Sequence, residues 1–141
     1  FHPVCTLVPG VPGLSENISV VSVVDRYLEH SRIFYFQNGG AEEIFLSSAD
    51  WMGRNLDRRI ELRFPVTDAE VFKTVRETLV LYFQDNTHSH TLQKNGNWKP
   101  NVPEKNEQAV RVQEVLYKKY KKRDDTKKSE PKVEFEVRRN D

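Results

Sequence analysis

The sequence has little cysteine and no long apolar run. Its 141 residues contain one cysteine, Cys5, so the chain cannot close a disulfide within itself, and we expect a reducing compartment. Cys5 sits in an apolar stretch, which favours a buried, unreactive thiol over a nucleophile. No stretch is apolar for long enough to cross a membrane, and we expect no signal peptide, so we place the protein in the cytoplasm.

The sequence also lacks an excess of either charge. Its 22 Lys and Arg and 21 Asp and Glu give a net charge of +1, which is not typical of a general nucleic-acid binder. We therefore expect no nucleic-acid partner. Hydrophobic residues make up 37% and charged residues 30% of the chain, which predicts one domain with a modest core and a long polar remainder.

The pattern of apolar residues predicts an α/β fold, with a mixed β-sheet and flanking helices. We expect a helix that begins with a capping box at Thr67 and Glu70 and buries an apolar stripe against the sheet. In chain order the predicted elements are a short buried strand at 4–8, a turn-rich loop at 9–13, a strand at 18–24, a helical turn at 25–29, a hairpin at 33–46, a strand at 59–66, a helix at 67–85, a polar loop at 88–105 and a helix at 106–123. Residues 1–123 then form the domain, and residues 124–141 form a polar tail that is either disordered or an edge strand.

The most informative stretch runs from Glu29 to Arg59. Two apolar runs flank the turn Asn38-Gly39-Gly40, which predicts a β-hairpin. Polar residues precede the first run (His30, Arg32) and follow the second (Ser47 to Asp50). Because antiparallel neighbours begin and end at the same edge, both polar groups should meet there, with His30 and Arg32 on one face.

This polar cluster has the chemistry of a phosphate site. The planar guanidinium of arginine matches phosphate oxygens, and histidine can act as nucleophile, acid or base near neutral pH. The candidate residues are His30 as a catalytic and phosphate-binding group and Arg32, Arg54 and Arg58 as phosphate-binding groups. The alternative is a surface hairpin whose arginines pair with Glu29, Asp50 and Asp57.

Alternation separates the roles of the neighbouring arginines Arg58 and Arg59. In a strand that opens at Arg59, Ile60, Leu62 and Phe64 share one face, which we expect to be the core face. Arg58 falls on that side, where it needs an anionic partner, and Arg59 falls on the other.

The sequence predicts no metal site. His88 and His90 form a His-x-His pair, but no cysteine or further histidine lies near them in the sequence to complete a set of ligands. A solvated loop is the simpler interpretation.

Three segments resemble one known family. The segments LVPGVPGLSENI, DRYLEHSRIFYF with the following NGG, and SSADWMGRNLDRRIE are similar to the C-terminal part of bacterial polyphosphate kinase, whose catalytic half resembles the phospholipase D superfamily. The resemblance implies a truncated phospholipase D-like half. In that superfamily each half-site carries a His-x-Lys motif and a later Ser/Gly-x-Asn motif. His30-x-Arg32 and Ser47-Ser48-Ala49-Asp50 stand at these places, with Arg for Lys and Asp for Asn, as in the second half-site of this kinase.

The resemblance implies a phosphotransfer activity. The expected reaction is reversible transfer of the ATP γ-phosphate to polyphosphate through a phosphohistidine carried by a preceding domain that this chain does not contain. Implied partners are ATP or ADP, polyphosphate, the remaining domains of the enzyme and further copies of it, with Mg²⁺ bound mainly outside this chain and peripheral membrane association as an alternative location. His2 stands where the family pattern has an arginine assigned to ATP phosphate, so that role is not carried over.

Two other functions remain open at this point. One is a phosphodiesterase of the phospholipase D superfamily, against which Arg32 in place of Lys and the lack of a Ser/Gly-x-Asn motif both count. The other is a non-catalytic module for anion binding or assembly. The sequence contains one half-site, so we expect this chain alone to be inactive.

Overall fold

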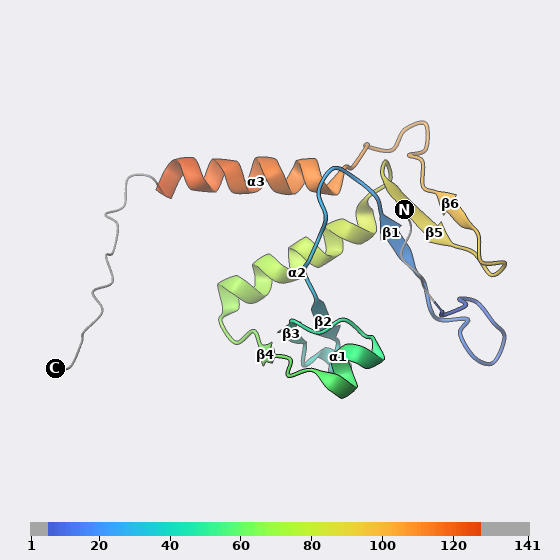
Figure 1. The fold of residues 1–141 in the computed structure, drawn as a ribbon. Coiled ribbons are helices and arrows are strands. Elements are labelled where there is room, and N and C mark those ends of the chain that lie inside the picture. The colour runs from blue at the N-terminus through green and yellow to red at the C-terminus, as the bar shows by residue number, and fades with distance from the viewer. Residues whose placement is uncertain (1–5, 128–141) are drawn as a thin grey trace.

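The computed structural model describes residues 6–127, with side chains through residue 122, and contains two small antiparallel sheets linked by a helix (Figure 1). One sheet has the order β2 (Ile33–Phe36), β3 (Glu43–Ser47), β4 (Arg63–Pro65). The other has the order β1 (Val21–Val23), β5 (Ser89–Leu92), β6 (Trp98–Pro100). The α/β class is confirmed. The single mixed sheet is wrong, because α2 separates the strands into two groups whose described pairs are all antiparallel.

The β2–β3 hairpin forms as predicted. Its strands pair from Ile33 with Leu46 to Phe36 with Glu43, and Ile44 is 1% exposed. The turn is a 3₁₀ turn, η1 (Asn38–Gly40), in which all three residues have positive φ, including 109° at Gly40. Glycine tolerates these backbone angles without a steric cost, which explains why the Gly-Gly pair marks the turn.

A short helix, α1 (Gly53–Arg58), precedes the strand predicted at 59–66, and residues 59–62 form neither helix nor strand. The strand β4 begins only at Arg63, and Ser48 Oγ accepts a hydrogen bond from Leu62 N (2.9 Å) just before it. The predicted core face is therefore wrong, since Ile60, Leu62 and Phe64 are 103%, 63% and 45% exposed. The separation of Arg58 from Arg59 by strand alternation is wrong as well, because Arg58 ends a helix and is exposed.

The helix α2 (Ala69–Gln84) runs from the first sheet towards the second (Figure 1). Its N-cap is Asp68 rather than Thr67, because the Asp68 carboxylate accepts from the backbone N–H groups of Glu70 (3.0 Å) and Val71 (2.9 Å). The helix contacts the hairpin through Glu42, which accepts from Arg76 Nη2 (3.1 Å) and from the Tyr35 hydroxyl (2.5 Å).

The apolar stripe of α2 is only partly covered. Its predicted members Phe72, Val75, Leu79 and Tyr82 are half-buried, whereas Val71 and Phe83 are 49% and 63% exposed. The stripe therefore forms part of a core in this chain, but the helix buries none of its residues completely.

The second sheet departs most from the prediction. The loop expected at 88–105 contains the β5–β6 hairpin, and the strand expected at 18–24 narrows to β1. The loop at 9–13 forms turns as predicted, with φ of 72° at Gly10 and 74° at Gly13. The helical turn at 25–29 is absent, and those residues bend without forming a helix.

The elements predicted near the two ends of the sequence lie only partly within the described residues. The buried strand at 4–8 is not formed at 6–8, where Leu7 and Val8 are 40% and 48% exposed. Cys5, His2 and residues 128–141 lie outside the described residues. The third helix, α3 (Val112–Lys127), begins six residues later than predicted and includes the first four residues of the predicted tail.

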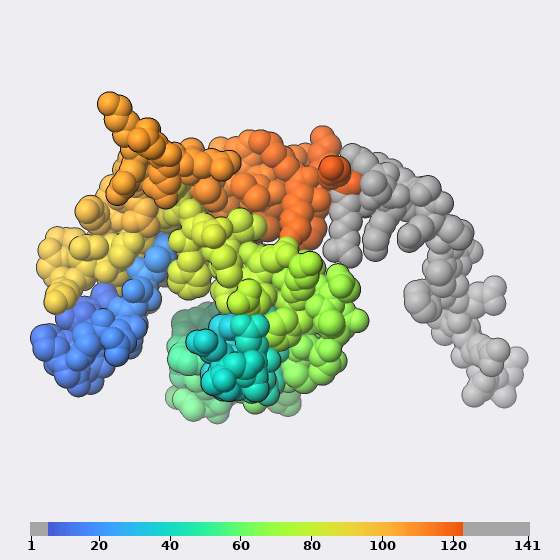
Figure 2. Space-filling view, turned by 180° about the vertical axis from the view of Figure 1, so that it is seen from behind, coloured from blue at the N-terminus to red at the C-terminus, as the bar shows by residue number. Residues whose placement is uncertain are grey.

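The main buried junction joins α2, β5 and α3. The Asp85 side chain accepts from the N–H groups of His88 (2.7 Å) and Val112 (2.8 Å), the latter at the start of α3. Val112 is fully buried, and Ser89 and Leu92 are 1% and 7% exposed. Figure 2 shows two separate lobes, the N-terminal segment (blue) below the β5–β6 segment (yellow) and the β2–β3 hairpin (cyan) below α2 (lime). Within residues 6–127, none of the helices is both long and apolar enough to cross a bilayer.

Candidate functional site

The open end of the β2–β3 hairpin brings the predicted polar residues together. Arg32 Nε donates to Asp50 Oδ1 (2.7 Å), and Arg32 Nη1 donates to the His30 carbonyl (3.0 Å). Ser47 N donates to the Arg32 carbonyl (3.0 Å), which closes the pairing one step beyond the strands. His30 and Arg32 lie before the first strand residue, so they meet through these bonds rather than by sharing a face of the strand.

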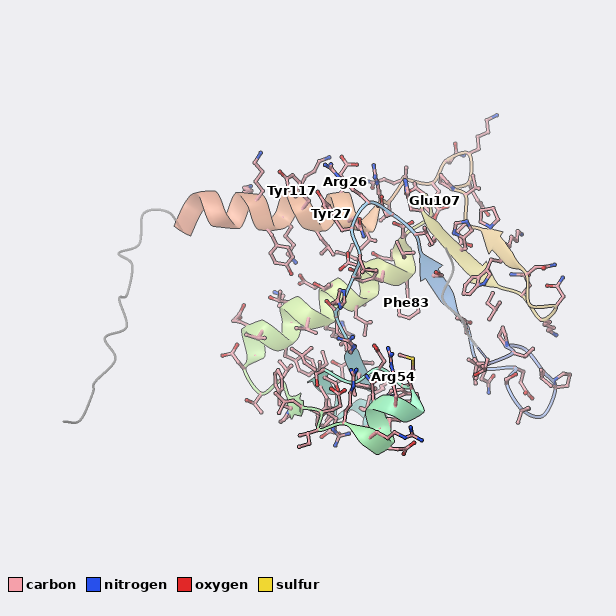
Figure 3. All side chains as sticks on the ribbon, in the orientation of Figure 1. Arg26, Tyr27, Arg54, Phe83, Glu107 and Tyr117 are labelled. Carbon is pink, nitrogen blue, oxygen red and sulfur yellow. The ribbon has the colours of Figure 1, made fainter. Side chains whose placement is uncertain are left out.

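Electrostatics extends this cluster to Arg54. The hydrogen bond from Arg32 is the largest cause of the lowered pKa of Asp50, and the charges of Arg54 and His30 lower it further. The same hydrogen bond raises the pKa of Arg32. Figure 3 shows Arg54 on the upper side of α1, beside the hairpin. Three of the four predicted residues therefore gather around Asp50, which remains accessible with 39% of its side chain exposed.

The fourth predicted residue, Arg58, lies elsewhere. It is the last residue of α1, where a cation is favoured by the helix dipole. Among the described residues, no hydrogen bond or ion pair joins Arg58 to His30, Arg32 or Asp50. The geometry of this chain therefore does not bring Arg58 into the cluster.

A cavity of about 450 Å³ opens beside His30 and Arg32. Such a volume is within the usual range for small-molecule sites. The hairpin and the residues before β4 form one side, and α2 and α3 supply Thr74, Val75, Thr78 and Tyr120 on the other. The Thr78 and Tyr120 hydroxyls lie 3.4 Å apart. No motif in the sequence marks these two residues, and the apolar spacing of their helices is the one feature that could have pointed to them.

The His30 side chain is exposed at this cavity. Within the described part of the chain, its imidazole makes no hydrogen bond, so its ring nitrogens have no protein partner there. An accessible imidazole beside two guanidinium groups can contact a phosphate and exchange a proton with it.

The start of α3 holds the segment that leads to His30. The Gln113 side chain accepts from Tyr27 N (2.8 Å) and donates to the Tyr27 carbonyl (2.7 Å), so its amide pairs with a peptide group as a neighbouring strand would. Gln113 also donates to Glu29 (3.0 Å) and is 5% exposed. Burial, followed by the Glu29 carboxylate, raises the pKa of the nearby Tyr82 hydroxyl.

A second anchor of this segment is the Asp25–Arg111 pair. Arg111 donates to both oxygens of Asp25, at 2.6 Å and 3.0 Å, and the Asp25 side chain is 2% exposed. The Arg111 hydrogen bond is the largest cause of the lowered pKa of Asp25.

The described residues do not fit a magnesium site by themselves. No group of three or more His, Cys, Asp or Glu side chains converges within them, and the Asp50 carboxylate is bound to Arg32. Mg²⁺ usually takes one or two carboxylates together with substrate phosphates and water.

Comparison with known proteins gives a consistent result. The family described as "Polyphosphate kinase C-terminal domain 2" matches residues 2–113. The polyphosphate kinase of Rhodopirellula baltica is 53% identical over 138 residues, which cover 98% of this chain and 16% of that protein. The polyphosphate kinase of Pseudomonas putida is 50% identical over 112 residues, or 79% of this chain and 15% of that protein.

A solved structure shares the fold. The crystal structure of polyphosphate kinase from Porphyromonas gingivalis superimposes with a TM-score of 0.80 at 41% identity, over 87% of this chain and 19% of that one. The chain thus spans less than a fifth of the length of each of these relatives.

Proposed function

The chain belongs to the polyphosphate kinase family, and we propose that it supplies one half of a phosphotransfer site within a longer enzyme. The proposal rests mainly on the hydrogen bond of 2.7 Å between Arg32 and Asp50. This bond joins the residues before β2 to those after β3 at the open end of the hairpin, beside the exposed His30. An arginine oriented by a carboxylate presents a fixed set of donors to a phosphate. The 450 Å³ cavity at this point provides room for part of a nucleotide or a phosphate chain.

The proposed reaction moves the γ-phosphate of ATP to polyphosphate. A histidine of a preceding domain attacks the γ-phosphorus, the bond to the β,γ-bridging oxygen breaks, and ADP leaves. A terminal oxygen of the polyphosphate chain then attacks the phosphohistidine, which restores the histidine and lengthens the chain by one phosphate. The same steps run in reverse.

The residues of this chain have defined roles in the proposal. His30 contacts the nucleotide phosphate and donates a proton or a hydrogen bond to the leaving oxygen. Arg32 and Arg54 offset the negative charge of the phosphates, and Asp50 orients Arg32. We also propose a phospholipase D-like arrangement, in which this half-site faces its counterpart, with Mg²⁺ bound mainly outside this chain.

Steady-state kinetics of the full enzyme tests this proposal. Arg32→Lys keeps the positive charge but loses the fork that joins Asp50 to the His30 carbonyl. We expect the KM for ATP to rise roughly tenfold, as for the loss of one charge-assisted contact. Arg63→Lys is the matched control. Arg63 belongs to β4, and its guanidinium lies 4.7 Å from the centroid of the Phe45 ring rather than at the Arg32–Asp50 pair. Equal effects of the two substitutions would contradict the proposal.

A further inference from the structure

A second cationic cavity lies between the segment before His30 and α3. It has a volume of about 620 Å³ and lies where Arg26 and Tyr27 meet the exposed side of α3. Figure 3 shows Arg26, Tyr27 and Tyr117 close together at this place. Arg26, Arg111, Lys118 and Lys121 supply four cations, and Glu114 supplies one carboxylate. The whole chain has a net charge of only +1, so this local excess is not a consequence of composition.

Aromatic rings hold two of these cations in place. The Arg26 guanidinium lies 5.3 Å from the Tyr27 ring centroid, and Lys121 Nζ lies 5.9 Å from the Tyr117 centroid. Both rings are about half exposed, at 50% and 55%. A cation over a ring face loses less mobility when it binds an anion than one on a free side chain.

The carboxylate in the cavity lining and the one beside it are already bound. Glu114, in the lining, pairs with Lys118 at 2.6 Å, and Asp25, which precedes Arg26 in the sequence, accepts from Nε and Nη2 of Arg111. Among the described side chains, Arg26 and Lys121 have no carboxylate partner. Among the side chains that the structure describes, these two cations are therefore the ones available to an external anion.

The cavity is connected to the candidate site around His30. A third cavity, of about 800 Å³, shares Tyr27, Tyr117 and Lys121 with the cationic cavity. It shares Thr78 and Tyr120 with the cavity beside His30. Glu29 lies along this connection, where Gln113 donates to its carboxylate (3.0 Å). The three cavities thus adjoin one another through these shared residues, from His30 to Arg26 and Lys121, and are together called the groove.

We propose that Arg26 and Lys121, held by Tyr27 and Tyr117, form a second binding site for the polyphosphate chain, remote from the phosphate that reacts. This inference rests on the proposed function and adds the place where the polymer is held. A linear polymer with a negative charge on each phosphate can extend along the groove and contact both cations. One nucleotide bound at His30 would not need them. The site would keep a growing chain bound between successive additions.

Binding and product length in the full enzyme test the proposal. The variant is Arg26→Ala with Lys121→Ala, and the probes are inorganic polyphosphate of about fifty units and ATP, each measured separately. We expect polyphosphate affinity at low salt to fall roughly tenfold and the dependence of log affinity on log salt to become shallower by about one to two units. Product chains should become shorter, while the KM for ATP changes less than about twofold.

Two controls define these results. Lys105→Ala removes an exposed cation from the loop before α3 and should leave polyphosphate affinity unchanged. Arg26→Lys with Lys121→Arg keeps both charges and should restore most of the affinity. Melting curves of all variants establish that they are folded.

Three results would overturn the proposal. The first is an unchanged polyphosphate affinity in the double variant. The second is a KM for ATP that rises by the same factor as the polyphosphate affinity falls. The third is a change in subunit or domain association, which would assign the cations to an acidic protein segment. A fully active His30→Ala enzyme would instead refute the proposed function. The effect of Arg26 and Lys121 on polymer binding is measured independently of that activity.

Discussion

At the residue scale, the pairing of Arg32 with Asp50 fixes the geometry of the candidate site. Arg32 precedes β2 and Asp50 follows β3, and the hydrogen bond of 2.7 Å between them holds Arg32 next to His30. Both side chains are partly exposed, so the value of this pair lies in orientation more than in stability.

The ionisation of Asp50 predicts how this pair responds to pH. The pKa of Asp50 is lowered from an ordinary value of about 3.9, so the pair is complete above that value and is lost as the pH falls through the lowered pKa. We expect Asp50→Asn to lower kcat/KM for ATP without changing the shape of the pH–rate profile between about pH 5 and 8. The disappearance of an inflection in that range would show that Asp50 titrates there.

The hairpin also shows what the sequence can predict about single residues. Its register brings His30, Arg32 and Asp50 to one end, and this followed from two apolar runs around a Gly-Gly turn. The position of Arg58 could not be predicted in this way, because it belongs to the six-residue helix α1, which has no side-chain cap to mark its start. Strand alternation was therefore applied to a residue that is helical.

At the element scale, the helix α2 was predicted closely, whereas the three-residue strands were predicted too long, as for β1 and β4, or missed, as for β6. The 16-residue helix α2 ends within one residue of its predicted end, whereas β1, β4 and β6 have three residues each. The strand β5 was missed because its sequence Ser-His-Thr-Leu is mostly polar. Its burial depends on Ser89 and Leu92, which are three residues apart and do not alternate.

The N-cap of α2 gives a prediction with a matched control. Asp68→Ala removes the acceptor for the N–H groups of Glu70 and Val71, which should destabilise the first turn by about 1 kcal/mol. Hydrogen exchange of those two amides should accelerate roughly fivefold. Thr67→Ala should have little effect, and a larger effect of Thr67→Ala would restore the capping box expected from the sequence.

The amide of Gln113 gives a prediction about the segment before His30. Gln113→Leu keeps the volume but removes both bonds to Tyr27 and the bond to Glu29. We expect faster hydrogen exchange at Tyr27 and a lower kcat, because His30 is held less firmly. Val115→Ala, on the same helix but 38% exposed, is the control. Unchanged exchange at Tyr27 would show that other contacts hold the segment.

At the scale of the whole molecule, much apolar surface remains uncovered. Among the described residues, eight large apolar side chains between positions 14 and 102 are at least 60% exposed: Leu14, Leu28, Trp51, Leu56, Ile60, Leu62, Phe83 and Val102. Where such side chains form contiguous patches, they are typical of interfaces. Sequence periodicity could not reveal it, because a core stripe and an interface stripe have the same spacing. It supports the proposal that the other domains of a longer enzyme cover these residues.

This arrangement predicts the behaviour of the chain by itself. In the proposed function this chain supplies one histidine half-site, and the described residues include no group of three metal ligands, so we expect the isolated chain not to synthesise polyphosphate from ATP. The measurement is ATP consumption with a polyphosphate primer. Turnover near that of the full enzyme would contradict the idea that a second half-site is needed.

The role of His30 is tested by the rate of polyphosphate synthesis in the full enzyme with His30→Ala. Loss of a general acid typically costs about 10²–10⁴-fold in rate, so the variant should lose at least about 10²-fold. Gln37→Ala, an exposed substitution at the far end of the same hairpin, should keep the normal rate, and hydrogen exchange in β2 and β3 should be the same in both. A His30→Ala enzyme that retains most of its activity would show that His30 takes no part in phosphotransfer.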